Sequence, residues 1–69
     1  MNRPALHADA RTWWTWATKS IDADLETCRT GLTTITRDRA ASTLDTMQAD
    51  GVIDIIDAEL TDRHDRIAA

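Results

Sequence analysis

The chain has 69 residues, with twelve acidic against eight basic side chains and a net charge of −4. A domain of this size buries a small share of its surface, so it usually needs a disulfide, a metal or a partner subunit to gain more than a few kcal/mol. The single cysteine, Cys28, excludes an internal disulfide, and the cysteine and two histidines lack zinc-site spacing. We therefore expect stabilisation by self-association, with no metal and no cofactor.

The acidic balance disfavours nucleic acid as the main partner, because binding to DNA or RNA gains its affinity by neutralising phosphates with a basic stripe. There is no run of about 18 apolar residues. No apolar segment of signal-peptide length follows Arg3, so we expect a cytoplasmic protein that does not enter a membrane. Arginine supplies seven of the eight basic residues, a bias typical of a GC-rich bacterial or phage genome.

The first half of the chain has the periodicity of one long amphipathic helix. At about 100° per residue, its apolar and small side chains fall within an arc of about 120°. The pattern predicts a helix over residues 5–35, about 45 Å long. Gly31 and the threonines around it favour an earlier end near residue 30, or a short strand over 32–36, and these alternatives stay open. The stripe comprises Leu6, Ala10, Trp13, Trp14, Ala17, Ile21, Leu25, Cys28, Leu32 and Ile35.

The second half of the chain predicts two further helices. The apolar phase is lost between residues 36 and 42, so we expect a turn there, followed by a short helix over 40–49. The sequence Ala-Asp-Gly at 49–51 predicts a stop. A third helix is expected over 52–67, because acidic residues lie near its start and arginines near its end, as the helix dipole favours.

All the aromatic side chains are tryptophans within four positions, Trp13, Trp14 and Trp16. On the helical wheel Trp13 and Trp14 border the apolar stripe, which favours packing against another helix. Trp16 lies about 60° outside the stripe, given the 100° helical step. Because exposed tryptophan is enriched at binding hot spots, we expect Trp16 to contact a second chain or a partner, with packing inside the chain as the alternative. The predicted interface is Trp13, Trp14, Trp16, Ile21 and Leu25.

The remaining polar and nucleophilic groups predict no catalytic site. Cys28 lies in the middle of the apolar stripe and is expected to be a small buried hydrophobic residue. Asp62, His64 and Asp65 form a short polar run, but a metal site needs further ligands and the only other histidine is His7. We interpret the run as a solvated helix end. With no glycine-rich phosphate loop either, we expect a protein that is not an enzyme.

One segment resembles the part of winged-helix regulators in which a recognition helix leads into a hairpin wing. The resemblance covers about twenty residues, and the sequence departs from the pattern downstream, where basic strands would be expected. It implies a DNA-associated transcriptional regulator as the alternative function. The matching residues are Thr43, Leu44, Met47, Asp50, Gly51, Val52 and Ile53, and the implied DNA contacts are Arg37, Arg39, Ser42 and Thr43.

We therefore predict an all-α domain of one long, one short and one medium helix, completed by self-association. The expected function is that of a small acidic adaptor, inhibitor or assembly protein, encoded by a phage or mobile element and acting through helix faces. Its partner is expected to be a second copy of the chain or a basic protein surface, chosen by charge complementarity. The acidic side chains expected to face that partner are Asp22, Glu26, Asp54 and Asp57.

Overall fold

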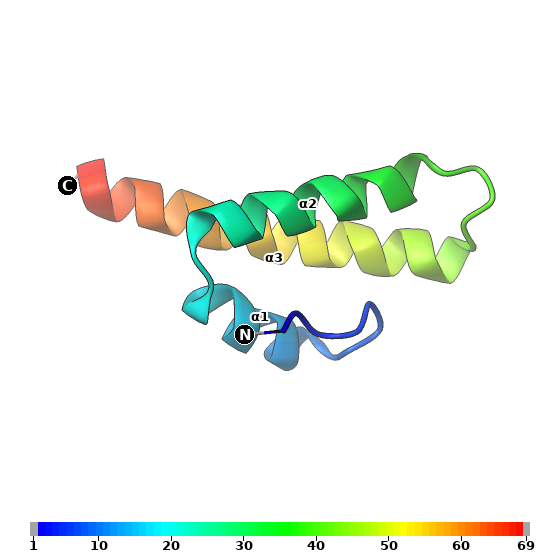
Figure 1. The fold of residues 1–69 in the computed structure, drawn as a ribbon, viewed down its shortest axis with the longest axis horizontal. Helices are drawn as coiled ribbons and strands as arrows, with labels where there is room; N and C mark the ends of the chain where they lie inside the picture. The colour runs from blue at the N-terminus through cyan, green and yellow to red at the C-terminus, as the bar shows by residue number, and fades with distance from the viewer. Residues whose placement is uncertain (1, 69) are drawn as a thin grey trace.

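A computed structural model describes residues 2–68, and these contain three α-helices and no strand (Figure 1). The helices are α1 (Ala10–Lys19), α2 (Asp22–Arg37) and α3 (Thr43–Ala68). Helices α2 and α3 form an antiparallel hairpin, and α1 packs beside it against α3. The molecule is elongated, with extents of 42 × 20 × 16 Å. The expected all-α class is confirmed. Among the described residues no helix is both long and apolar enough to cross a membrane.

The prediction of a single helix over residues 5–35 is wrong in two respects: the helix starts later, and the chain breaks it in the middle. Helix α1 begins only at Ala10, where the Asp9 carboxylate caps it by accepting the Thr12 N–H at 2.8 Å. It ends at Lys19, because Ser20 takes an extended conformation and its hydroxyl donates to the Trp16 carbonyl at 2.7 Å. The chain then turns, and the apolar stripe is divided between α1 and α2, whose buried residues join one core.

Helix α2 runs through Gly31 to Arg37, so the helix does not stop at the glycine and residues 32–36 do not form a strand. The turn expected between residues 36 and 42 is confirmed, since α2 ends at Arg37 and α3 begins at Thr43. The Ser42 hydroxyl accepts the Asp45 N–H at 3.1 Å, as expected of a helix cap.

The stop expected at 49–51 is wrong, because α3 continues through Gly51 as one helix of 26 residues. A glycine inside a helix costs about 1 kcal/mol relative to alanine. Burial of Val52 and Ile56, which are 1 % and 0 % exposed, outweighs that cost. The same continuity removes the feature that resembled a winged helix, since residues 52–53 lie inside α3 where a hairpin wing would begin.

The core draws three side chains from each helix. Two tryptophans of α1 meet edge to face there, with the ring centroids of Trp13 and Trp16 5.6 Å apart and their planes at 85°. Cys28 is buried among these apolar residues, as its place in the stripe predicts. The core consists of Trp13, Trp16, Ala17, Leu25, Cys28, Leu32, Ala49, Val52 and Ile56.

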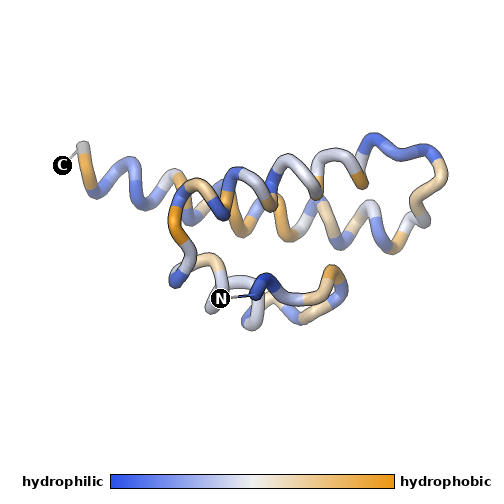
Figure 2. The backbone as a smooth tube through the Cα atoms, in the orientation of Figure 1, coloured by the Kyte–Doolittle hydropathy of each residue, from blue (hydrophilic) through white to orange (hydrophobic). Residues whose placement is uncertain are grey.

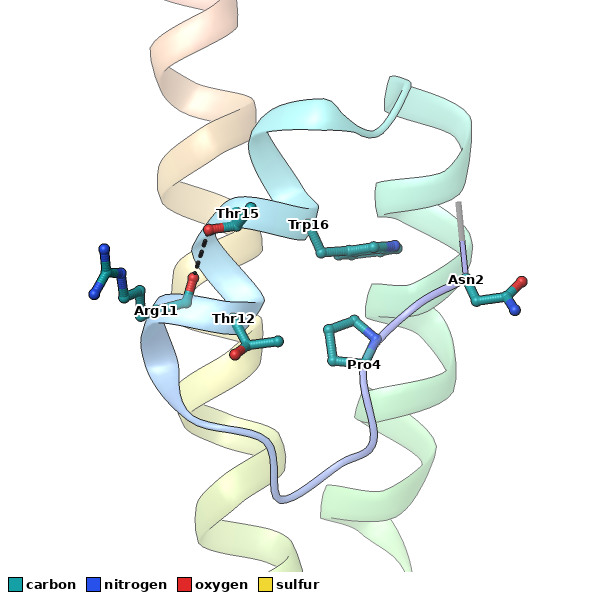
Figure 3. A pocket seen from close by; sticks show the side chains of 6 residues that line it. All are labelled: Asn2, Pro4, Arg11, Thr12, Thr15 and Trp16. Carbon is teal, nitrogen blue, oxygen red and sulfur yellow. Dashed lines mark hydrogen bonds between the residues drawn. The ribbon is translucent and has the colours of Figure 1, made fainter.

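The segment before α1, residues 2–8, crosses the molecule between α1 and α2, and we call it the N-terminal strap (Figure 3). The Gln48 side-chain amide holds it by donating to the carbonyl oxygens of Leu6 and Ala8, at 2.8 and 3.1 Å. A further polar contact joins His7 Nε2 to Asp45 Oδ1 at 2.5 Å. The strap thereby covers the side of the core that α1 and α2 leave open.

Candidate interaction surfaces

Three of the five predicted interface residues lie inside the single chain. Trp13, Trp16 and Leu25 are 1 %, 6 % and 0 % exposed, whereas Trp14 and Ile21 are 40 % and 65 % exposed. The structure therefore places only the last two where a partner could reach them. The alternative expected for Trp16, packing inside the chain, is the one observed.

Trp16 is covered by the N-terminal strap, whose Pro4 ring lies next to the indole (Figure 3). A cavity of about 380 Å³ opens between strap and helix, lined by Asn2, Pro4, Arg11, Thr12, Thr15 and Trp16. The indole Nε1 of Trp16 is buried without a hydrogen-bond partner among the described residues. The Trp16 side chain is therefore buried by N-terminal residues of the same chain.

A single arginine joins all three helices at the end of the molecule where α2 begins. Arg63 on α3 donates to Asp22 Oδ1 at 2.7 Å, to Glu59 Oε1 at 2.9 Å and to the Ala17 carbonyl oxygen at 2.8 Å. These contacts raise the already high pKa of Arg63, chiefly through the hydrogen bond to Asp22 and then through that to Glu59. Glu59 is only 6 % exposed, so Arg63 also neutralises a buried carboxylate.

The charge of the chain is concentrated at this end. Residues 21–29 and 57–67, which we call the acidic end, carry seven acidic and three basic side chains and hence a net charge of −4. The rest of the chain carries five of each and is neutral. Of the acidic side chains at this end, Asp24, Glu26 and Asp65 form no ion pair with any described residue.

The acidic end also holds a groove between α2 and α3, with a volume of about 380 Å³. Leu60 and Ile67 give it apolar walls, and Ile67 is 84 % exposed. Ile21, which is 65 % exposed, precedes α2 at the same end of the molecule. The other lining residues are Asp22, Glu26, Thr61 and His64. The groove thus combines an apolar surface with carboxylates at its edge.

The opposite end of the long axis, residues 37–47, contains the connection between α2 and α3, and we call it the turn end (Figures 1 and 2). Leu44 and Met47 are 72 % and 65 % exposed there. Arg37 and Arg39 are exposed and form no ion pair with a described residue. The turn end therefore presents apolar side chains beside two arginines without an ion pair to a described residue, and Asp38 and Asp45 bring its formal net charge to zero.

Sequence reasoning missed Leu44, Met47 and Ile67 as surface residues. For Met47 the signal was present once residues 43–68 are taken as one helix. With about 100° per residue, Met47 then falls on the side opposite Val52 and Ile56, which face the core, and Leu44 lies at the edge of the core face. The assumed stop at Gly51 hid this relationship. Ile67 lies on the same side as Ile56, so the helical wheel gives no signal for its exposure.

The four acidic residues expected to face a partner divide into two pairs. Asp22 and Asp57 are engaged within the chain, by Arg63 at 2.7 Å and by Arg29 at 2.6 Å. The Asp57 carboxylate raises the pKa of Arg29 through its hydrogen bond. Glu26 and Asp54 remain exposed, with no ion pair to a described residue. Of the two, only Glu26 belongs to the acidic end and lines its groove, whereas Asp54 lies on α3 outside both.

The residues implied as DNA contacts lie together around the connection between α2 and α3. Arg37 closes α2, Arg39 follows in the turn, and Thr43 opens α3. Ser42 is committed to capping α3. Two arginines flanking Asp38 do not make the basic stripe that phosphate neutralisation requires.

Comparisons with protein-family models, with curated proteins and with solved structures found no match to this chain.

Proposed function

We propose that this protein is a non-enzymatic helical module for protein–protein interaction, an adaptor, inhibitor or assembly protein that binds at least a second copy of itself. The observation that supports it is the exposure of four large apolar side chains at the two ends of one elongated molecule. Ile21, Leu44, Met47 and Ile67 are 65 %, 72 %, 65 % and 84 % exposed. Large apolar surface left open on a small domain is characteristic of contact sites.

The dimensions of the chain support the same proposal. Its exposed surface is 4897 Å², whereas a compact monomer of 7.7 kDa exposes about 4,300 Å². Its radius of gyration is 12.3 Å, compared with about 11 Å for a compact chain of this length. A standard protein interface covers about 800 Å² on each partner. The exposed area in excess of that of a compact monomer is therefore similar in size to the area that one interface buries on each partner.

Sedimentation equilibrium tests the proposal. The wild-type chain is expected to show an average mass that rises above 7.7 kDa as its concentration increases. A fourfold variant, Ile21→Ser with Leu44→Ser, Met47→Ser and Ile67→Ser, is expected to stay monomeric with unchanged helix content by circular dichroism. The control Thr18→Ser/Thr34→Ser changes exposed helix positions away from the two ends and should associate like the wild type.

A wild type that remains at 7.7 kDa up to about 1 mM would contradict the proposal, because even a contact of about −4 kcal/mol would be half-formed there. Equal association of the fourfold variant would also contradict it, since the exposed apolar residues would then have no part in the contact.

A further inference from the structure

We infer that copies of this chain bind head to tail, with the turn end of one molecule seated on the acidic end of the next. This inference rests on the self-association proposed above and adds the orientation of the contact. It is carried by three relationships between the ends: their charges, their exposed apolar side chains and their positions on the long axis.

The difference in charge between the two ends favours contact between unlike ends. The acidic end carries the whole net charge of −4 and has Glu26 and Asp65 free of ion pairs with the described residues. The turn end carries two arginines and two aspartates, so its formal net charge is zero. Arg37 and Arg39 form no ion pair with a described residue, whereas the Asp45 carboxylate contacts His7. Contact between two acidic ends would bring like charges together, so electrostatics favours the opposite pairing.

The apolar surfaces are complementary. The turn end projects two long, flexible side chains, Leu44 and Met47, from the first turns of α3. The acidic end offers the groove walled by Leu60 and Ile67, with a volume of about 380 Å³. A cavity of about 150 Å³ is enough to hold benzene. The groove therefore has room for both projecting side chains.

The positions of the ends set the symmetry of the assembly. They lie at opposite ends of a molecule 42 Å long, as the turn and the C-terminal part of α3 show in Figure 1. A contact between two different surfaces is heterologous, and it leaves one end of each kind free in a pair. Further copies can then add, so the assembly extends into chains or rings and does not stop at two.

Two variants, each blocked at one end, test the inference. Arg37→Glu/Arg39→Glu blocks the turn end, and Glu26→Arg/Ile67→Ser blocks the acidic end. Each variant alone is expected to sediment as a monomer. Their equimolar mixture is expected to form a one-to-one complex of twice the chain mass of 7.7 kDa, because each retains the end that the other lacks.

Two further samples serve as controls. Asp54→Arg makes the same charge change as Glu26→Arg at an exposed site outside both ends, and it should assemble like the wild type. Glu26→Gln alone, a milder substitution, should weaken wild-type association at least threefold. It keeps the inference testable if the double variant is unfolded by circular dichroism.

The outcomes separate the two proposals. A wild type that forms a closed dimer and nothing larger, or blocked variants that do not combine on mixing, would overturn the head-to-tail orientation while leaving self-association standing. A wild type that is monomeric at all concentrations would overturn both.

Discussion

Arg63 donates a hydrogen bond from Nη2 to the carbonyl oxygen of Ala17, 2.8 Å away and 46 residues earlier in the chain. This carbonyl lies in the last turn of α1 and also accepts the N–H of the cap residue Ser20 at 3.3 Å, so Arg63 gives it a second donor. The same guanidinium reaches Asp22 in the first turn of α2 and Glu59 on α3. One side chain thus fixes how the three helices meet beside the acidic end.

Replacing this arginine should destabilise the fold. Arg63→Met leaves the Glu59 carboxylate, 6 % exposed, without its nearest partner. Breaking a fully buried ion pair costs about 3–5 kcal/mol. The other carboxylate here, on Asp22, has its side chain 66 % exposed, so we expect a smaller loss of about 2 kcal/mol in the free energy of unfolding.

Urea denaturation followed by circular dichroism measures this loss. The control is Arg66→Met, whose side chain is 66 % exposed and should matter by less than about 0.5 kcal/mol. Equal losses for the two variants would show that the Arg63 junction has no special role.

Alanine at Gly51 should stabilise the protein. A Cβ built there meets nothing within 4 Å, and the glycine has no positive φ that a side chain would strain. Alanine lowers the conformational entropy of the unfolded chain, so Gly51→Ala should raise the free energy of unfolding by about 0.5–1 kcal/mol. Thermal and urea unfolding measure the change. Destabilisation would indicate that the helix is interrupted at this glycine.

Gly51 also illustrates what the sequence could and could not predict. The spacing of apolar residues is a property of neighbouring positions in the sequence. It was sufficient to predict an all-helical chain and the turn before α3. Local preference at Gly51 predicted a stop, whereas the buried contacts of Val52 and Ile56 keep the helix continuous. Such contacts form between distant segments and leave no signal in a local pattern.

The break at Ser20 was hidden for a different reason. The apolar residues before and after it stay in phase on one helical wheel, so periodicity fits one long helix and two shorter ones equally well. Burial of Trp16 depends in turn on the strap, which packs against residues far along the chain. Of the predicted contact residues, Trp14 and Ile21 are exposed, and their role in binding stays a prediction.

Acid should remove the contribution of the Asp9 cap. Hydrogen bonds from the Thr12 side chain and then from its backbone N–H lower the pKa of Asp9 below its ordinary value of 3.8. A carboxyl group whose pKa is lower in the folded state stabilises the fold at pH values above its unfolded pKa, and this stabilisation is lost as the pH falls through the folded value. The pH window therefore lies in the acid range, near and below pH 3.8.

The measurement is the difference in Tm between wild type and Asp9→Asn as a function of pH. Wild type should be the more stable at neutral pH, and the difference should shrink as the pH falls through that window. Asp54→Asn, an exposed carboxylate away from any helix end, should show no comparable trend. A difference for Asp9→Asn that stays constant through the window would contradict the assignment.

Loss of Gln48 should loosen the N-terminal strap. Its amide makes both hydrogen bonds to Leu6 and Ala8, so Gln48→Ala should cost about 1–2 kcal/mol of unfolding free energy. Release of the strap would also open Trp16 to solvent. We expect greater quenching of tryptophan fluorescence by acrylamide in this variant than in the wild type, and likewise in Gln48→Glu, because a carboxylate keeps the shape of the side chain but cannot donate to the two carbonyl oxygens. Unchanged quenching would mean that the strap is held by other contacts.

We propose that the exposed ends of this chain bind further copies of it, and sedimentation equilibrium of the wild-type protein across a concentration series at low and high salt measures that binding. We expect an average mass that climbs above 7.7 kDa with concentration, and less steeply at high salt because the contact pairs opposite charges. A mass of 7.7 kDa at every concentration and salt level would contradict the claim.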